Sequence, residues 1–152
     1  MIKAVLFDFS RTLLKAKDEN YGDSLNSLYK RQKQSPEYNP LDDFELNQEL
    51  LDFAASIKNT YPLYIFTTGI IQEDVKFKSV INSIFKQVFT VSEVGYAKDS
   101  KEAYVEIAHR INVKPEEIMF IDDEKDNVDA AKEAGLETVH YESAEQVKEV
   151  LA

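Results

Sequence analysis

Residues 2–12 read IKAVLFDFSRT, an apolar run that ends in an aspartate and a short polar turn. A run this short and this rich in Val, Leu and Phe is typical of a buried β-strand. Comparable runs recur along the chain, and segments with helical spacing of their apolar residues lie between them. The five expected strands are Ile2–Phe9, Pro62–Thr68, Gln87–Val91, Ile118–Asp122 and Glu137–Tyr141.

This alternation of strands and helices predicts right-handed βαβ crossovers and a mostly parallel sheet with helices on both faces. The sequence therefore predicts an α/β protein with a doubly wound, Rossmann-like sheet. Helix ends agree with this interpretation. Pro115–Glu117 resembles the turn into a strand, and Gly135 stands where a left-handed C-terminal cap would lie. A further helix is expected over Phe44–Asn59, before the second strand.

Composition limits the classes of function. With 152 residues, of which 43% are hydrophobic, the chain fits one domain over residues 1–152. A formal net charge of −10 disfavours nucleic acid as a partner, because the protein's field repels phosphate backbones. The absence of cysteine excludes disulfides, thiolate metal sites and cysteine nucleophiles. We recognise neither a signal peptide nor an apolar run of ~20 residues, so we expect a cytoplasmic protein without a membrane partner.

The segment at about residues 14–43 interrupts the alternation. It offers one expected helix, from Ser24 to Gln34, and then a turn-rich piece over Ser35–Pro40. We interpret this segment as a small insertion over the carboxyl edge of the sheet.

Polar residues at the carboxyl ends of the expected strands point to a binding site, since ligands of open α/β sheets bind there. Asp8 follows the first strand, Thr67–Thr68 ends the second, and Asp122–Asp123 ends the fourth. Carboxylates beside a buried sheet are costly unless a cation compensates them. Clustered hard oxygen ligands suit Mg²⁺, which also binds phosphate oxygens. The pattern therefore predicts a Mg²⁺-dependent phosphoryl site.

Each of these residues also has an ordinary structural explanation. Asp8 could cap a turn, Thr67–Thr68 could finish a strand, and Asp122–Asp123 could cap the helix that follows. Lys98 could be a solvated surface lysine. The order and spacing of the four positions favour a shared site over four separate coincidences.

The chain resembles the haloacid dehalogenase-like (HAD) superfamily along almost its whole length, through four motifs in order. The family pattern is a strand followed by Asp-x-Asp-x-Thr, a strand ending in Ser or Thr, a lysine shortly before a helix, and an acidic pair after a strand. The corresponding stretches are VLFDFSRTL (5–13), LYIFTTG (63–69), GYAKDSKEAY (95–104) and MFIDDEKDNVDAAKEAGL (119–136).

The resemblance implies catalytic roles for residues of the first three motifs. Asp8 would be the nucleophile and would form an aspartyl-phosphate, which divides one difficult displacement into two easier ones. Thr67–Thr68 and Lys98 would bind the phosphoryl oxygens and offset their developing charge. Dehalogenase members need no metal, so the acidic pair weighs against that branch.

The resemblance also implies a metal site. Asp8, the backbone carbonyl of Ser10 and Asp123 would ligate Mg²⁺, while Asp122 would act through a water or orient the site. Asn127 stands where many members carry a further carboxylate.

Ser10 departs from the family pattern, because phosphatases of the family carry an acid/base aspartate there. General acid–base catalysis is typically worth ~10²–10⁴-fold, and a serine hydroxyl supplies little of it. Three interpretations stay open: a phosphatase restricted to good leaving groups such as acyl or aryl phosphates, a phosphoryl-transfer or phosphate-binding protein, and a binding scaffold without catalysis.

The small size of the 14–43 insertion, interpreted as a reduced cap, bears on the substrate. An open site would suit a phosphorylated small molecule or a protein-borne phosphate. The cluster Tyr29-Lys30-Arg31-Gln32-Lys33 could face such a substrate, but a solvated helix face is the commoner role for such a cluster.

Overall fold

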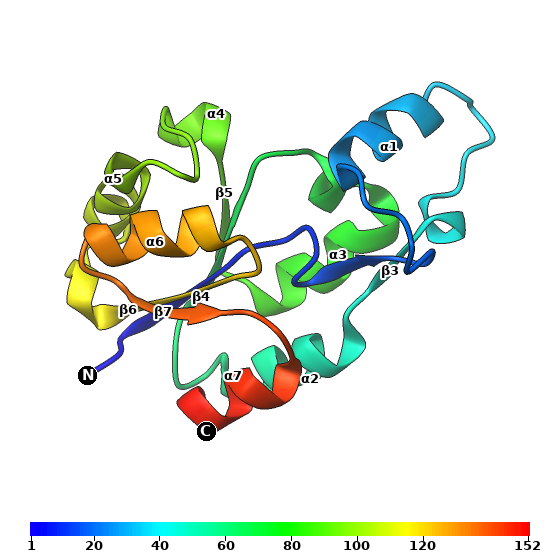
Figure 1. Cartoon of the computed structure of the whole chain (residues 1–152). Helices are drawn as coiled ribbons and strands as arrows, with labels where there is room; N and C mark the ends of the chain where they lie inside the picture. Colours follow the sequence, from blue (N-terminus) through cyan, green and yellow to red (C-terminus); the bar gives the residue numbers. More distant parts are fainter.

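The computed structural model describes residues 1–152 and contains a central sheet of five parallel strands (Figure 1). Their order across the sheet is β5-β4-β1-β6-β7, so the chain winds outward from β1 in both directions. This confirms the doubly wound fold class that the sequence predicts. The five strands are β1 (Ala4–Phe7), β4 (Leu63–Thr67), β5 (Gln87–Thr90), β6 (Ile118–Asp122) and β7 (Glu137–His140).

Helices cover both faces of this sheet (Figure 1). Every residue of the three central strands is buried, which explains their continuous apolar runs. Alternate side chains of β1 enter opposite cores: Val5 and Phe7 join one cluster, and Ala4 and Leu6 join the other. The first core is closed by α2 (Gln48–Ile57), α3 (Val75–Ile84) and α7 (Ala144–Leu151), the second by α4 (Val91–Val94), α5 (Lys101–Ile111) and α6 (Lys125–Glu133).

The helix ends follow local sequence signals. Pro115–Glu117 forms a 3-10 turn (η3) directly before β6, as predicted. Gly135 follows α6 with φ of +102°, a left-handed conformation that costs little only without a Cβ atom. No helix has both the length and the apolar composition needed to cross a membrane.

The segment between β1 and β4 contains a second, two-stranded sheet that the sequence analysis missed. β2 (Leu14–Ala16) pairs antiparallel with β3 (Phe44–Leu46). The prediction of a helix over Phe44–Asn59 is therefore wrong at its start, and α2 begins only at Gln48. Phe44 is buried and Glu45 exposed, which is the alternation of a strand. Three residues are too few for this period to stand out in the sequence.

Between β2 and β3 the chain forms helix α1 (Leu25–Gln32) and the 3-10 turn η1 (Pro40–Asp42). The Ser24 hydroxyl accepts a hydrogen bond from the Ser27 backbone N–H and caps α1, so the expected helix exists and is slightly shorter than predicted. Tyr29 anchors α1 to the start of α3, because its hydroxyl donates to Asp74, the N-cap residue of α3, at 2.8 Å. Lys30 and Arg31 on α1, and Lys33 at its C-cap, are exposed.

Candidate active site at the carboxyl edge of the sheet

Asp8 is the first residue after β1 and is almost completely buried, with 5% of its surface exposed. Its backbone N–H continues the sheet by donating to Ile121 at 2.8 Å. The Thr12 hydroxyl donates to Asp8 Oδ2 at 3.0 Å, and the Lys98 ammonium donates to Asp8 Oδ1. Both carboxylate oxygens are thereby oriented at the edge of the sheet.

A tight turn over residues 9–14 carries Ser10 and Thr12. The Phe9 carbonyl accepts from the backbone N–H groups of Thr12, Leu13 and Leu14, at 3.2, 2.9 and 2.9 Å. Arg11 has φ of +64°, an uncommon left-handed conformation for a residue with a side chain. Its guanidinium donates to the carbonyls of Tyr21 and Asp23, at 3.0 and 2.7 Å, and so connects this turn to the segment that leads into α1.

Asp122 and Asp123 are neighbours in sequence but lie in different surroundings. Asp122 ends β6, is fully buried, and accepts hydrogen bonds from the Glu124 N–H at 2.9 Å and the Asn127 amide at 3.0 Å. Lys98 lies 3.0 Å from Asp122 and therefore bridges it to Asp8. Asp123 is half-buried and lines the cavity above Asp8. Carboxylate oxygens of Asp8, Asp122 and Asp123 lie within 4.8 Å of one another.

These charges shift one another's protonation. Burial raises the pKa of Asp8 from 3.8 to about 6. The positive charge of Lys98 lowers this pKa, and the negative charge of Asp122 raises it further. Burial, and then the charge of Asp8, raise the pKa of Asp123 to about 9. Burial by itself would lower the pKa of Lys98, but the charges of Asp8 and Asp122 outweigh it and the pKa is raised. The cluster thus holds more negative charge than one ammonium offsets, which favours a bound cation.

A cavity of about 220 Å³ lies over these side chains. Its lining is polar apart from Leu25, and the first turn of α1 contributes to it, so the 14–43 segment stands beside the nucleophile candidate. The buried Ser10 hydroxyl has no hydrogen-bond partner. The lining residues are Asp8, Ser10, Arg11, Ser24, Leu25, Asn26, Thr68, Lys98, Asp123, Glu124 and Asn127.

The two threonines after β4 differ in their access to this cavity. Thr68 is exposed and lines it, whereas Thr67 is buried and lies outside its lining. Gly69 follows in close contact with α1, since a Cβ atom there would lie 1.9 Å from Asn26 Oδ1. The chain can make this approach only without a side chain at position 69 or with Asn26 displaced.

No role for Thr12, Arg11 or the α1 residues of the cavity was predicted from the sequence. Thr12 belongs to the first motif and stands four residues after Asp8, which was a usable signal. Arg11 and Asn26 carry no comparable signal, because their contacts depend on how the 14–43 segment folds back.

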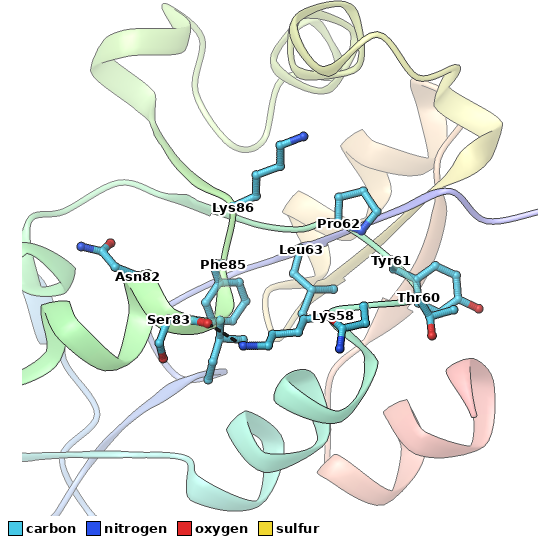
Figure 2. A pocket seen from close by; sticks show the side chains of 11 residues that line it. Lys58, Thr60, Tyr61, Pro62, Leu63, Asn82, Ser83, Phe85 and Lys86 are labelled. Atoms are coloured by element: carbon cyan, nitrogen blue, oxygen red, sulfur yellow. Dashed lines mark hydrogen bonds between the residues drawn. The ribbon is translucent and has the colours of Figure 1, made fainter.

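A second cavity, of about 450 Å³, lies at the opposite edge of the sheet, between the ends of α2 and α3 and the starts of β4 and β5 (Figure 2). None of the candidate catalytic or metal-binding residues lines it. The Lys58 ammonium donates to the Ser83 carbonyl at 2.9 Å, in the last turn of α3. A cation is favourable at a helix C-terminus, so this lysine has a structural role there.

Fold and site together define the class of protein: a doubly wound α/β protein with a buried lysine between strand-end carboxylates. A family model described as haloacid dehalogenase-like hydrolase matches residues 44–135, which is more than half of the chain. The chain belongs to this family. The matched range includes Lys98 and the Asp122–Asp123 pair and begins after Asp8.

Curated relatives match over part of their length. The chain is 31% identical over 83 residues to the enolase-phosphatase E1 of Persephonella marina, and 34% identical over 83 residues to that of Aquifex aeolicus. Each match covers 51% of this chain and 36% of the relative. The matched region is thus about a third of those proteins.

Solved structures share the fold over the entire chain. A HAD family enzyme from Bacteroides thetaiotaomicron, in complex with magnesium and inorganic phosphate, has a TM-score of 0.71 at 16% identity and covers 100% of both chains. A HAD-superfamily hydrolase from Geobacter sulfurreducens has a TM-score of 0.73 at 16% identity, covering 99% of this chain and 97% of that one. At 16% sequence identity, this structural similarity establishes the fold alone.

Proposed function

We propose that the protein is a Mg²⁺-dependent phosphohydrolase or phosphoryl-transfer protein that works through an aspartyl-phosphate on Asp8. The observation that carries this proposal is the arrangement of Asp8, Lys98 and Asp123 around one polar cavity, with both oxygens of Asp8 oriented. The curated relatives named enolase-phosphatase and the neighbour crystallised with magnesium and phosphate support the same chemistry.

The donor set fits Mg²⁺. By resemblance to the family, Asp8, Asp123 and the Ser10 backbone carbonyl would hold the ion. Asp122 is fully buried, accepts from Glu124, Asn127 and Lys98, and is better placed to orient the site. The bound ion would offset the charge of the carboxylates and of the phosphoryl oxygens.

The proposed reaction has two steps. An oxygen of Asp8 attacks phosphorus, the bond from phosphorus to the leaving oxygen breaks, and the aspartyl-phosphate forms. Water, or the hydroxyl of an acceptor, then attacks the same phosphorus, releases its proton to solvent and frees the Asp8 carboxylate. Lys98 offsets negative charge on the phosphoryl oxygens, and Thr67–Thr68 lies at the strand end where those oxygens would be bound.

Ser10 sets the limits of this activity. Its buried, unpaired hydroxyl is a poor acid or base at neutral pH. The proposal is therefore weak turnover of alkyl phosphates and better turnover of acyl or aryl phosphates, whose leaving oxygens need little protonation. The alternative is a catalytically degenerate scaffold that binds phosphate or a protein. The serine at position 10 also favours this alternative, because it removes the acid/base carboxylate.

Substrate size follows from the cavity and its surroundings. A cavity of about 220 Å³ is smaller than the ~300–1,000 Å³ usual for drug-sized ligands, which suits the phosphoryl group of a small molecule. A protein-borne phosphate would have to reach Asp8 past α1, where Lys30 and Arg31 are exposed.

The decisive experiment measures hydrolysis of a mixed panel of alkyl, aryl and acyl phosphates, together with one phosphoprotein, with and without Mg²⁺. Activity that requires Mg²⁺ and disappears in Asp8→Asn supports the enzyme. No hydrolysis across the panel by the folded protein would refute the enzyme and leave the scaffold.

A further inference from the structure

Asn47 is a buried polar residue that joins three separate parts of the chain, and no motif includes it. Its side chain and backbone together are only 3% exposed. The backbone N–H donates to the Leu13 carbonyl at 2.7 Å. The side-chain amide donates to the Thr12 carbonyl at 2.9 Å and to the Tyr141 hydroxyl at 2.7 Å. Its oxygen accepts from the Leu50 N–H at 3.3 Å and so caps α2.

Two of these contacts lead to the strand ends that carry the carboxylates. Thr12 accepts the Asn47 hydrogen bond through its carbonyl, and its hydroxyl donates to Asp8 Oδ2 at 3.0 Å. On the other side, the Tyr141 backbone N–H donates to the Asp122 carbonyl at 2.8 Å. Asn47 therefore lies between the turn that follows β1 and the segment that follows β7, with one hydrogen-bonded partner in each.

We propose that Asn47 is a positioning residue for Asp8, acting through Thr12. The proposal rests on the proposed function, since it assumes that Asp8 is the nucleophile. Asn47 fixes the backbone of Thr12, and this fixes the direction in which the Thr12 hydroxyl meets the carboxylate. Lys98 holds the other oxygen of Asp8.

The physical reason is the freedom of a carboxylate. Rotation about the last torsion of an aspartate has only broad minima, so its oxygens are oriented by their partners. Without the Asn47 amide, the buried Thr12 carbonyl would lose its partner, and the turn would shift to find another. The Thr12 hydroxyl would move with it. Attack on phosphorus would then become less frequent while binding of the phosphoryl group by Lys98 stays intact.

The test is Asn47→Ser. Serine keeps an oxygen that can cap α2 but lacks both amide donors, so the helix keeps its cap and Thr12 loses its partner. We expect kcat on an aryl phosphate to fall by roughly 10- to 100-fold, as for a small misplacement of a reacting group, with KM nearly unchanged. The matched control is Asn39→Ser, which makes the same substitution at a half-buried cap outside the site, where the side chain accepts from the Leu41 N–H. Asn39→Ser should behave like the wild type.

A crystal structure of Asn47→Ser separates this inference from the proposed function. We expect the hydrogen bond from Thr12 to Asp8 to be lost or lengthened while α2 is retained. If that hydrogen bond is unchanged, or if kcat equals that of the wild type, the inference is wrong. If the wild type hydrolyses nothing, the proposed function is wrong, and the structure of the variant still decides whether Asn47 orients Asp8.

Discussion

Acidification of the metal-free protein tests the electrostatics of the site, and Asp8→Asn is the variant that isolates Asp8. Burial raises the pKa of Asp8 from 3.8 to about 6 in the folded protein. A group whose pKa is raised by folding binds more protons in the folded state than in the unfolded state. Its protonated form therefore stabilises the fold below about pH 4, and this contribution is lost as the pH rises through about 6.

The magnitude follows from the two pKa values. Since one pKa unit is worth about 1.36 kcal/mol, ionised Asp8 costs the metal-free fold about 3 kcal/mol relative to its protonated form. Over the accessible range from pH 7 to pH 5, the same two values give a gain of about 1 kcal/mol on acidification. Asp8→Asn is permanently neutral at this position, so it should lack this gain and should be as stable as the wild type at pH 7, or more stable.

The measurement is urea unfolding followed by circular dichroism at pH 5, 6 and 7, in EDTA, for both proteins. Comparison with the variant removes the contribution of titrating groups that do not interact with Asp8, whereas Asp123, whose pKa is raised in part by the charge of Asp8, differs between the two proteins. Saturating Mg²⁺ should reverse the slope of the wild type, because protons then compete with the ion. An identical pH dependence in the two proteins would refute a raised pKa at Asp8. A large loss of stability in Asp8→Asn at pH 7 would identify Asp8 as a structural cap instead.

Two further predictions concern the metal and the missing acid. Mg²⁺ at about ten times its Kd should stabilise the wild type by about 1.4 kcal/mol in a thermal melt and leave Asp123→Ala unaffected; equal stabilisation of that variant would place the ion elsewhere. Ser10→Asp should raise kcat/KM most for alkyl phosphates and least for aryl phosphates, in a manner that requires Mg²⁺ and Asp8. If a folded, Mg²⁺-binding Ser10→Asp gains nothing on any ester, the acid/base deficit is not what limits the protein.

Much of the fold and site could be predicted from sequence because both depend on strands that are buried on both faces. The runs ending at Asp8 and Asp122 are continuous and apolar, and parallel strands bring their carboxyl ends to one edge. Lys98 stands 90 residues from Asp8 and could be placed only through the resemblance to the family.

The parts that escaped prediction depend on contacts between segments without a strong pattern. β2 and β3 have three residues each, which is too few for an alternation of buried and exposed residues to be recognised in the sequence. The pairing of Ala16 with Phe44 could therefore not be predicted. Asn47 reads as an ordinary helix cap in the sequence. Its second role, toward Thr12 and Tyr141, exists only once β1, α2 and β7 are assembled.

The net charge of the site depends on which residue stands at position 10. When all are ionised, the three carboxylates and the single ammonium of Lys98 leave two negative charges, which one divalent cation neutralises. A phosphoryl group carries negative charge as well, so the unfilled cluster repels it and the cation should bind before or together with the substrate. An aspartate at position 10 would add a third uncompensated charge whenever it is ionised. Compared with an aspartate, Ser10 therefore lowers the repulsion that the phosphoryl group would meet, but it also weakens the attraction for the cation and lacks the acid/base carboxylate of the family pattern. We therefore expect Ser10→Asp to bind the phosphoryl group more weakly and to turn over its substrate faster.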